Sequence, residues 1–98
     1  MRIYELEVFR KSLKKSLSDE QVRLFDKRLA SLKQSHGKPL GPYWLRELRF
    51  GSKRVYYVVR DDYALFISAS DKKSQQKVIN TLRADIEVFT ELLDQLTR

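Results

Sequence analysis

The sequence has no cysteine, one histidine, three glycines and two prolines among its 98 residues. The lack of cysteine excludes disulfides, cysteine zinc sites and thiol nucleophiles, and it fits a reducing, cytoplasmic setting. A single histidine without a spaced set of carboxylates argues against a transition-metal site. The glycines form neither a P-loop nor a dinucleotide-binding pattern. We therefore expect no metal and no cofactor.

Long hydrophobic runs are also absent. The segment MRIYELEVFRKSLKKS at residues 1–16 carries charges on both sides of a short apolar stretch, so we expect neither a signal peptide nor a membrane span. No repeat, low-complexity segment or linker divides the chain. Its length suits one small domain over residues 1–98.

Positive charge is what the sequence has in excess. It holds 20 lysines and arginines against 13 aspartates and glutamates, which gives a formal net charge of +7. An excess of this size favours an anionic partner, most often nucleic acid, although an acidic protein would serve equally. Composition alone does not separate these two partners.

Apolar periodicity predicts two elements in the first third of the chain, a strand over residues 2–8 and a helix after Ser18. One or two helical turns over residues 9–17 separate them. Ser18 and Gln21 have the spacing of a capping box, with acidic residues in the first turn. The apolar residues that share one face of this helix are Val22, Phe25, Leu29 and Leu32. We expect the helix to end at His36-Gly37.

The middle of the chain favours β-structure after a loop. The segment HGKPLGP holds two of the three glycines and both prolines, which predicts the loop. Three strands follow, over Tyr43–Phe50, Lys53–Arg60 and Tyr63–Ser68. Tight turns at Gly51-Ser52 and Asp61-Asp62 join them into an antiparallel meander.

From Asp71 onward the period becomes helical, with Asp71 or Ser70 as the cap. The apolar residues on one face are Val78, Leu82, Ile86, Phe89, Leu93 and Leu96. The pattern predicts one helix of roughly 26 residues, about 39 Å long at 1.5 Å per residue, whose acidic residues disfavour contact with nucleic acid. The element order predicts an α+β domain, with helices packed on one face of a small antiparallel sheet.

Basic residues cluster in the middle strands and directly after them. Alternation places Arg46 on the side of Trp44, and it places Arg49 on the opposite side with Glu47. Lys53 and Arg54 open the next strand, and the segment DKKSQQK follows the last one. If these two strands are neighbours, both basic groups converge on one concavity suited to phosphate. The alternative is that Arg49 pairs with an acid and the lysines only solvate a helix start.

Tyr56 and Tyr57 offer a second nucleic-acid feature. They are adjacent in a predicted strand, so one should face the core and the other should face out, where an aromatic ring can stack on a base. Core packing is the commoner role for either ring.

Three segments then suggest a family. In order, KPLG, LRELRFGSKRVYYVV and FISASDKKSQQKVINTLRADIEVF resemble the RelE/ParE superfamily of toxin-antitoxin toxins, and most closely its HigB-like addiction module killer branch. The resemblance covers Lys38 to Phe89. It implies a RelE-like fold and a toxin neutralised by an antitoxin protein, commonly one that cleaves messenger RNA on the ribosome without a metal.

The resemblance also implies roles for particular residues. Arg49 matches the arginine of the ELR segment, Arg54 the basic residue that opens the next strand, and Lys72 and Lys73 the basic positions after the last strand. These four would serve the attack of a ribose 2′-hydroxyl on the adjacent phosphorus, with Arg54 stabilising the phosphate charge. The residues expected to contact RNA are Arg46, Lys53, Tyr56 and Lys77. The group that takes the 2′ proton stays open, because Glu47 can face the wrong way.

The sequence departs from the family pattern in one respect. Many ribonuclease members carry a tyrosine or histidine after the last strand, whereas SDKKSQQKV has neither. This leaves two alternatives, a ParE-like poison of DNA gyrase and a non-catalytic relative that only binds nucleic acid or its partner.

Overall fold

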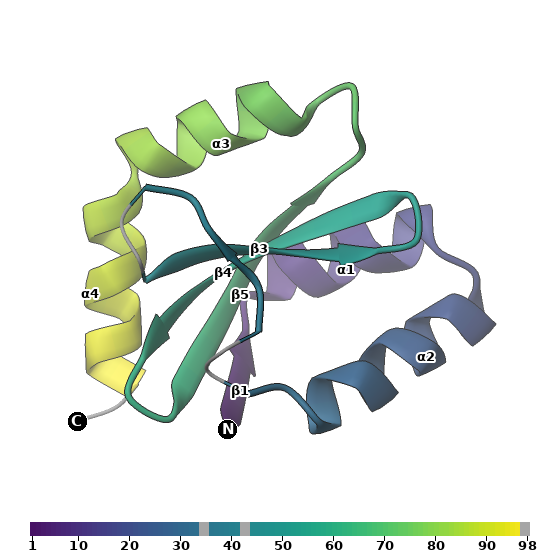
Figure 1. The fold of residues 1–98 in the computed structure, drawn as a ribbon, viewed down its shortest axis with the longest axis horizontal. Coiled ribbons are helices and arrows are strands. Elements are labelled where there is room, and N and C mark those ends of the chain that lie inside the picture. Colours follow the sequence, from purple (N-terminus) through teal and green to yellow (C-terminus); the bar gives the residue numbers. More distant parts are fainter. Residues whose placement is uncertain (34–35, 42–43, 97–98) are drawn as a thin grey trace.

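The computed structural model describes residues 1–33, 36–41 and 44–96. Its elements follow one another in the order β1 (Arg2–Glu5), α1 (Glu7–Ser16), α2 (Asp19–Ala30), β2 (Lys38–Pro39), β3 (Leu45–Phe50), β4 (Lys53–Arg60), β5 (Tyr63–Ser70), α3 (Gln75–Ala84) and α4 (Ile86–Leu96). In Figure 1, α1 and α2 lie on one side of the central sheet, and α3 and α4 lie on the other. The predicted α+β class is confirmed.

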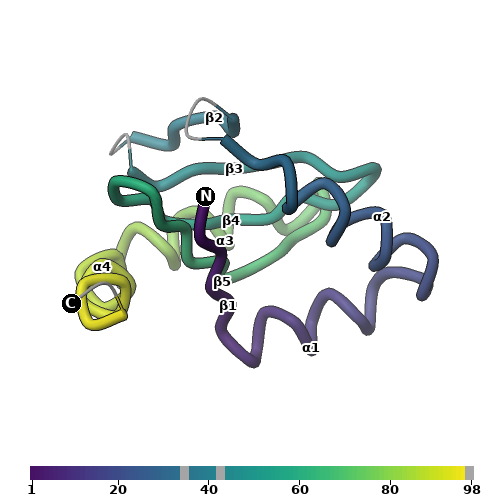
Figure 2. The backbone as a smooth tube through the Cα atoms, turned by 90° about the horizontal axis from the view of Figure 1, so that it is seen from below, coloured from purple at the N-terminus to yellow at the C-terminus, as the bar shows by residue number. Residues whose placement is uncertain are grey.

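The strands form one sheet in the order β1-β5-β4-β3-β2. The meander of β3, β4 and β5 is antiparallel, as the turn signals predicted, and β4 has the predicted bounds. However, β1 pairs with β5 in parallel, so the sheet is mixed and not purely antiparallel. Figure 2 shows the strands stacked in this order between α4 on one side and α2 on the other.

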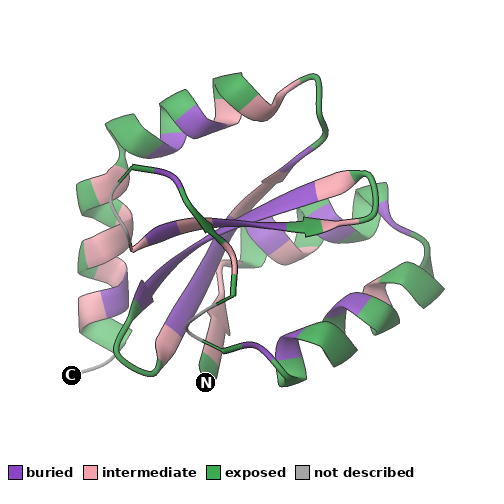
Figure 3. Ribbon diagram, in the orientation of Figure 1, coloured by how far each residue is buried: buried purple, intermediate pink, exposed green. Residues whose placement is uncertain are grey.

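Helices cover both faces of the sheet, so the expectation of one covered face was wrong. One core cluster joins α1 and α2 to the sheet through residues such as Phe9, Phe25 and Tyr57. The other joins α3 and α4 to the opposite face through Tyr56, Ile79 and Leu93. Because both faces are covered, β4 is buried almost throughout, from Arg54 to Val59 (Figure 3).

The start of α2 follows its sequence signal, and its end does not. The Ser18 side chain accepts from the Gln21 backbone amide, and the Gln21 side chain accepts from the Ser18 amide, so the capping box is confirmed. The helix ends at Ala30 and not at His36-Gly37. Hydrogen bonds that span three residues, as in a 3₁₀-helix, close its last turn; in one of them the Ser31 amide donates to the Arg28 carbonyl. Residues 34–35 of the predicted helix and Tyr43 of the predicted strand lie outside the described residues.

The predicted final helix is divided in two at Asp85, which ends α3. A straight helix of about 39 Å would exceed the longest dimension of the molecule, 34 Å. The break lets α3 pack against β5 and α4 against β4 and β5, so both halves bury their apolar faces. The predicted cap at Asp71 or Ser70 was wrong, because α3 begins at Gln75 with Ser74 as its N-cap; Asp71 instead orders the preceding turn, where its Oδ1 accepts from the Ser74 amide at 2.9 Å.

Candidate functional site

Strand register brings polar residues together where β3, β4 and β5 meet the start of α3. Arg54 lies opposite Arg49 of β3 and opposite Ser70 of β5, and Glu47 lies opposite Tyr56. Residues directly opposite one another share a face, and so do residues two apart on one strand. The group therefore faces α3, which adds Gln75. We call it the Glu47 cluster, consisting of Glu47, Arg49, Arg54, Tyr56, Ser70 and Gln75.

Two arginines directly opposite each other are unusual in a sheet, because like charges in this position are destabilising. Arg49 is exposed, whereas Arg54 is only 8% exposed. Glu47, 5% exposed, lies beside them, with its Oε1 3.9 Å from Arg54 Nε. One carboxylate thus stands against two guanidinium groups, so the cluster carries an excess positive charge.

The hydrogen bonds of this ion pair are incomplete. Gln75 Nε2 donates to Glu47 Oε2 at 2.8 Å, which fixes one carboxylate oxygen. Arg54 Nε is buried and has no hydrogen-bond partner among the described residues. A buried donor without a partner costs free energy, and a bound anion that accepts from the guanidinium would recover part of that cost.

The two tyrosines of β4 are both buried, at 0% for Tyr56 and 1% for Tyr57, so the expectation that one faces out was wrong. The ring of Tyr56 therefore has no surface on which a base can stack. Its hydroxyl lies 2.7 Å from Ser70 Oγ, and burial raises the pKa of Tyr56 above its ordinary value. This hydroxyl stays protonated near neutral pH and belongs to the cluster as a polar group.

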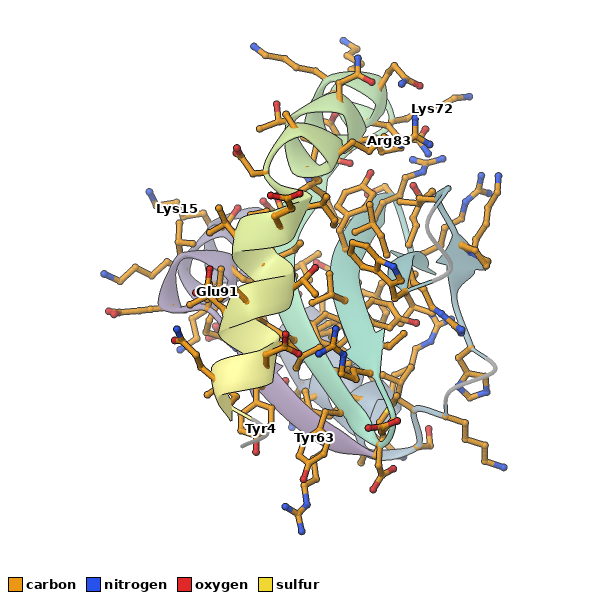
Figure 4. The ribbon with its side chains drawn as sticks, turned by 90° about the vertical axis from the view of Figure 1, so that its left-hand side faces the viewer. Tyr4, Lys15, Tyr63, Lys72, Arg83 and Glu91 are labelled. Carbon is orange, nitrogen blue, oxygen red and sulfur yellow. The ribbon has the colours of Figure 1, made fainter. Side chains whose placement is uncertain are left out.

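The other predicted basic residues divide into two groups. Lys72, Lys73 and Lys77 are exposed, and the first two lie in the turn that follows Ser70. Figure 4 shows Lys72 beside α3. Hydrogen bonds from the Ser74 amide and hydroxyl order this turn and hold the pKa of Asp71 below its usual range. Strands β4 and β5 are neighbours, as the prediction required, and the convergence of these lysines on the cluster stays a prediction.

Lys53 and Arg46 alternate to the face of the sheet opposite to that of Arg54 and Glu47. Lys53 lines a cavity of about 180 Å³ together with Ser12 and Ser16 of α1 and with Ser70 of the cluster. Arg46 faces the same side of the sheet as Leu48, and its Nη1 donates to the His36 carbonyl at 3.0 Å.

Glu47, Ser70 and Gln75 were not among the predicted site residues. The alternation of β3 already placed Glu47 on the side of Arg49, but the pairing that brings Arg54 beside it needed the register. Gln75 carries no signal of its own in the sequence, because its role depends on how α3 lies over the sheet.

Two negative findings apply to the described part of the chain. It contains no group of three or more histidine, cysteine, aspartate or glutamate residues that could hold a metal ion. None of its helices has both the length and the apolar character needed to cross a membrane.

Comparison with known proteins gives a fold but no family. No family model matches the chain, and no curated protein matches it in sequence. The solution structure of HP0894 from Helicobacter pylori, described as a conserved hypothetical protein, is similar at 17% sequence identity with a TM-score of 0.50. The match covers 74% of this chain and 96% of HP0894. At this identity the likeness extends to the arrangement of helices and strands alone.

Proposed function

We propose that this protein is the toxin of a type II toxin-antitoxin module and acts as a metal-independent messenger RNA endoribonuclease that inhibits translation. The observation that carries the proposal is the pair Arg49 and Arg54, held opposite each other beside the buried carboxylate of Glu47. The RelE/ParE resemblance of the sequence supports the same reading, with HigB-like toxins as the nearest branch.

The cluster has the groups that cleavage by a ribose 2′-hydroxyl requires. Glu47 accepts the proton of the hydroxyl as its oxygen forms a bond to the neighbouring phosphorus. The bond from phosphorus to the 5′ oxygen breaks, which leaves a cyclic phosphate, and the 5′ oxygen takes up a proton from water. Arg54 and Arg49 stabilise the charge that develops on the phosphate oxygens, so cations of the chain do the work that a metal does elsewhere.

Lys72 and Lys73 would hold the RNA strand at the rim, since exposed lysines bind phosphates as mobile point charges. The same basic surface would accept an acidic or amphipathic segment of a cognate antitoxin. An antitoxin lying there would block access to the Glu47 cluster, and this would neutralise the toxin.

The second candidate is a ParE-like poison of DNA gyrase. It is favoured by the low exposure of Glu47 and Arg54, 5% and 8%, which leaves little catalytic surface for a phosphate to reach. It is also favoured by the absence of tyrosine and histidine from the segment after β5. A non-catalytic relative that only binds its partner would share both features.

The decisive experiment maps RNA 5′ ends across the transcriptome after brief expression of the wild type, Arg49→Ala, Arg54→Ala and Arg23→Ala. Arg23 is exposed on α2, so its variant is a control for the loss of one positive charge. New ends inside coding regions that disappear in the Arg49 and Arg54 variants and persist in the Arg23 variant would support a ribonuclease. Growth arrest with unchanged RNA ends and an induced DNA-damage response would instead identify gyrase as the target.

A further inference from the structure

A polar cavity lies where β3 begins and β4 ends, at the opposite end of β4 from the Glu47 cluster. Its volume of about 330 Å³ is at the lower end of the range for small-molecule pockets. Helix α4, at the front of Figure 4, lies over this end of the sheet. Residues that line it include Trp44, Arg46, Arg60, Asp61, Thr90 and Leu93.

The lining combines an apolar wall with a polar edge of both charges. Leu93 is fully buried and the half-buried Trp44 packs against both core clusters, so these two supply the apolar wall. Arg46 and Arg60 supply guanidinium groups, while Asp61 contributes a carboxylate and Asp94 forms an ion pair with Arg60.

The balance of charge narrows the class of ligand. Among the residues that the structure describes, Arg46 and Arg60 are balanced in charge by Asp61 and by Asp94, the ion-pair partner of Arg60, so a phosphate or an acidic peptide would gain little net attraction there. A neutral, flat ring with both donors and acceptors at its edge fits better, because a carboxylate accepts from donors while a guanidinium donates to acceptors. A nucleobase has this chemistry.

We propose that this cavity binds a nucleobase, which stacks on Trp44 and is read at its edge by Arg60 and Asp61. Aromatic side chains are the usual platforms for unpaired bases, and arginine can donate two bonds to the O6 and N7 acceptors of guanine. Guanine also carries amino and imino donors for a carboxylate, so it presents the most complementary edge of the four bases.

This inference rests on the proposed function in one respect, that the base belongs to the RNA strand cut at the Glu47 cluster. Arg60 is six residues beyond Arg54 on β4, about 20 Å at 3.3 Å per residue. A strand with 3.4 Å between stacked bases covers that distance in about six nucleotides. The cavity would thus hold a base on the same RNA, away from the cleaved bond.

The single tryptophan gives this cavity its own optical reporter. We would titrate the full chain with guanosine, uridine and ribose 5-phosphate and follow Trp44 fluorescence. The expected result is saturable quenching by guanosine, weaker binding of uridine, and no response to ribose 5-phosphate. Equal responses to ribose 5-phosphate and guanosine, or no saturation with either nucleoside, would overturn the proposal, as would quenching by an acidic peptide alone.

A variant test separates a base site from general attraction of RNA. The probe is a fluorescein-labelled single-stranded 2′-O-methyl RNA, which cannot be cleaved through its 2′ oxygen, and its anisotropy reports binding. Arg60→Gln should weaken binding of a guanine-containing oligonucleotide by about fivefold or more, since a bidentate base contact contributes about 1–3 kcal/mol. Lys15→Gln removes one exposed charge on α1 and should change it by less than about twofold. Equal losses in the two variants would refute a base site.

The outcomes also separate this inference from the ribonuclease proposal. Quenching of Trp44 by guanosine in a protein that leaves cellular RNA intact would keep the base site and refute the ribonuclease. Cleaved cellular RNA together with no change in Trp44 fluorescence would support the ribonuclease and refute the base site. Binding of free guanosine without any effect of Arg60→Gln on the oligonucleotide would overturn the assignment of the base to an RNA strand.

Discussion

Replacing Glu47 by glutamine should destabilise the protein strongly, because it removes the charge that compensates the buried guanidinium of Arg54. The two side chains are 3.9 Å apart. At an effective dielectric constant of about 20 their attraction is about 4 kcal/mol, and breaking a buried pair typically costs about 3–5 kcal/mol. The new amide keeps an oxygen for the hydrogen bond from Gln75, but its amino group then replaces the oxygen that faces Arg54 Nε, so two donors face each other and the attraction is lost.

We expect a fall in the free energy of unfolding of about 3 kcal/mol, out of a total of about 5–15 kcal/mol for a domain of this size. Urea unfolding followed by circular dichroism measures it, and the midpoint should fall by about 1–3 M. Glu91→Gln is the matched control, because Glu91 is an exposed carboxylate on α4 and its loss should stay within about 0.5 kcal/mol. A Glu47 variant as stable as the control would refute the buried ion pair.

A double variant, Glu47→Gln with Arg54→Met, separates stability from function. Replacing the remaining buried cation by an apolar side chain of similar length should restore most of the lost stability. Under the ribonuclease proposal it should restore no cleavage, because both the proton acceptor and the phosphate ligand are gone. A double variant that regained stability and cleaved RNA would show that the Glu47 cluster is structural.

Three further predictions concern the framework of the fold. Ser18→Ala should lower the free energy of unfolding by about 1 kcal/mol in thermal denaturation, because it removes the capping box of α2. Gly37→Ala should lower the free energy of unfolding more than Gly51→Ala does. Both glycines have a positive φ, 81° at Gly37 and 59° at Gly51. However, a Cβ at Gly37 would overlap the Tyr57 hydroxyl, whereas a Cβ at Gly51 would meet open space. Burial raises the pKa of the Tyr56 hydroxyl, so as the pH rises the unfolded chain loses this hydroxyl proton at a lower pH than the folded protein does. The free energy of unfolding should therefore fall above about pH 10, by up to about 1.4 kcal/mol per pH unit. In urea unfolding from pH 8 to 11, Tyr56→Phe should show a shallower fall, and parallel curves would contradict the assignment.

The three strands of the meander and their two turns were predictable because their signals are local, whereas β2 lies in the segment predicted as a loop and β1 ends at Glu5 and not at residue 8. The bounds of β4 follow from the tight turns on either side of it, and the start of α2 follows from the spacing of Ser18 and Gln21. The division of the last helix into α3 and α4 has no local signal in the sequence. Its apolar face continues in helical register through Asp85, and the break reflects the size of the sheet that α3 and α4 must cover.

The sequence pattern also did not lead us to predict that helices cover both faces of the sheet. Strand β4 is nearly continuous in apolar and aromatic residues from Val55 to Val59, which is typical of a strand buried on both sides. The basic residues at its two ends obscured this, and Tyr56 was assigned to an open face. Because helices lie on both sides, most of the Glu47 cluster is buried, and Arg49 is the one of its six residues that is exposed.

The candidate site shows most clearly where prediction from sequence stops. Arg49 and Arg54 could be named from the sequence, but their opposition depends on the register of the β3–β4 hairpin, which the turn Gly51-Ser52 determines. A shift of one residue would turn every side chain of β4 to the other face, so Arg54 would move to the face near α1 while Glu47 stayed under α3. The ion pair of Glu47 with Arg54 and the opposition of Arg49 to Arg54 exist in one register only. The hairpin turn, with Gly51 at a φ of 59°, is therefore as necessary to the Glu47 cluster as the charged side chains themselves.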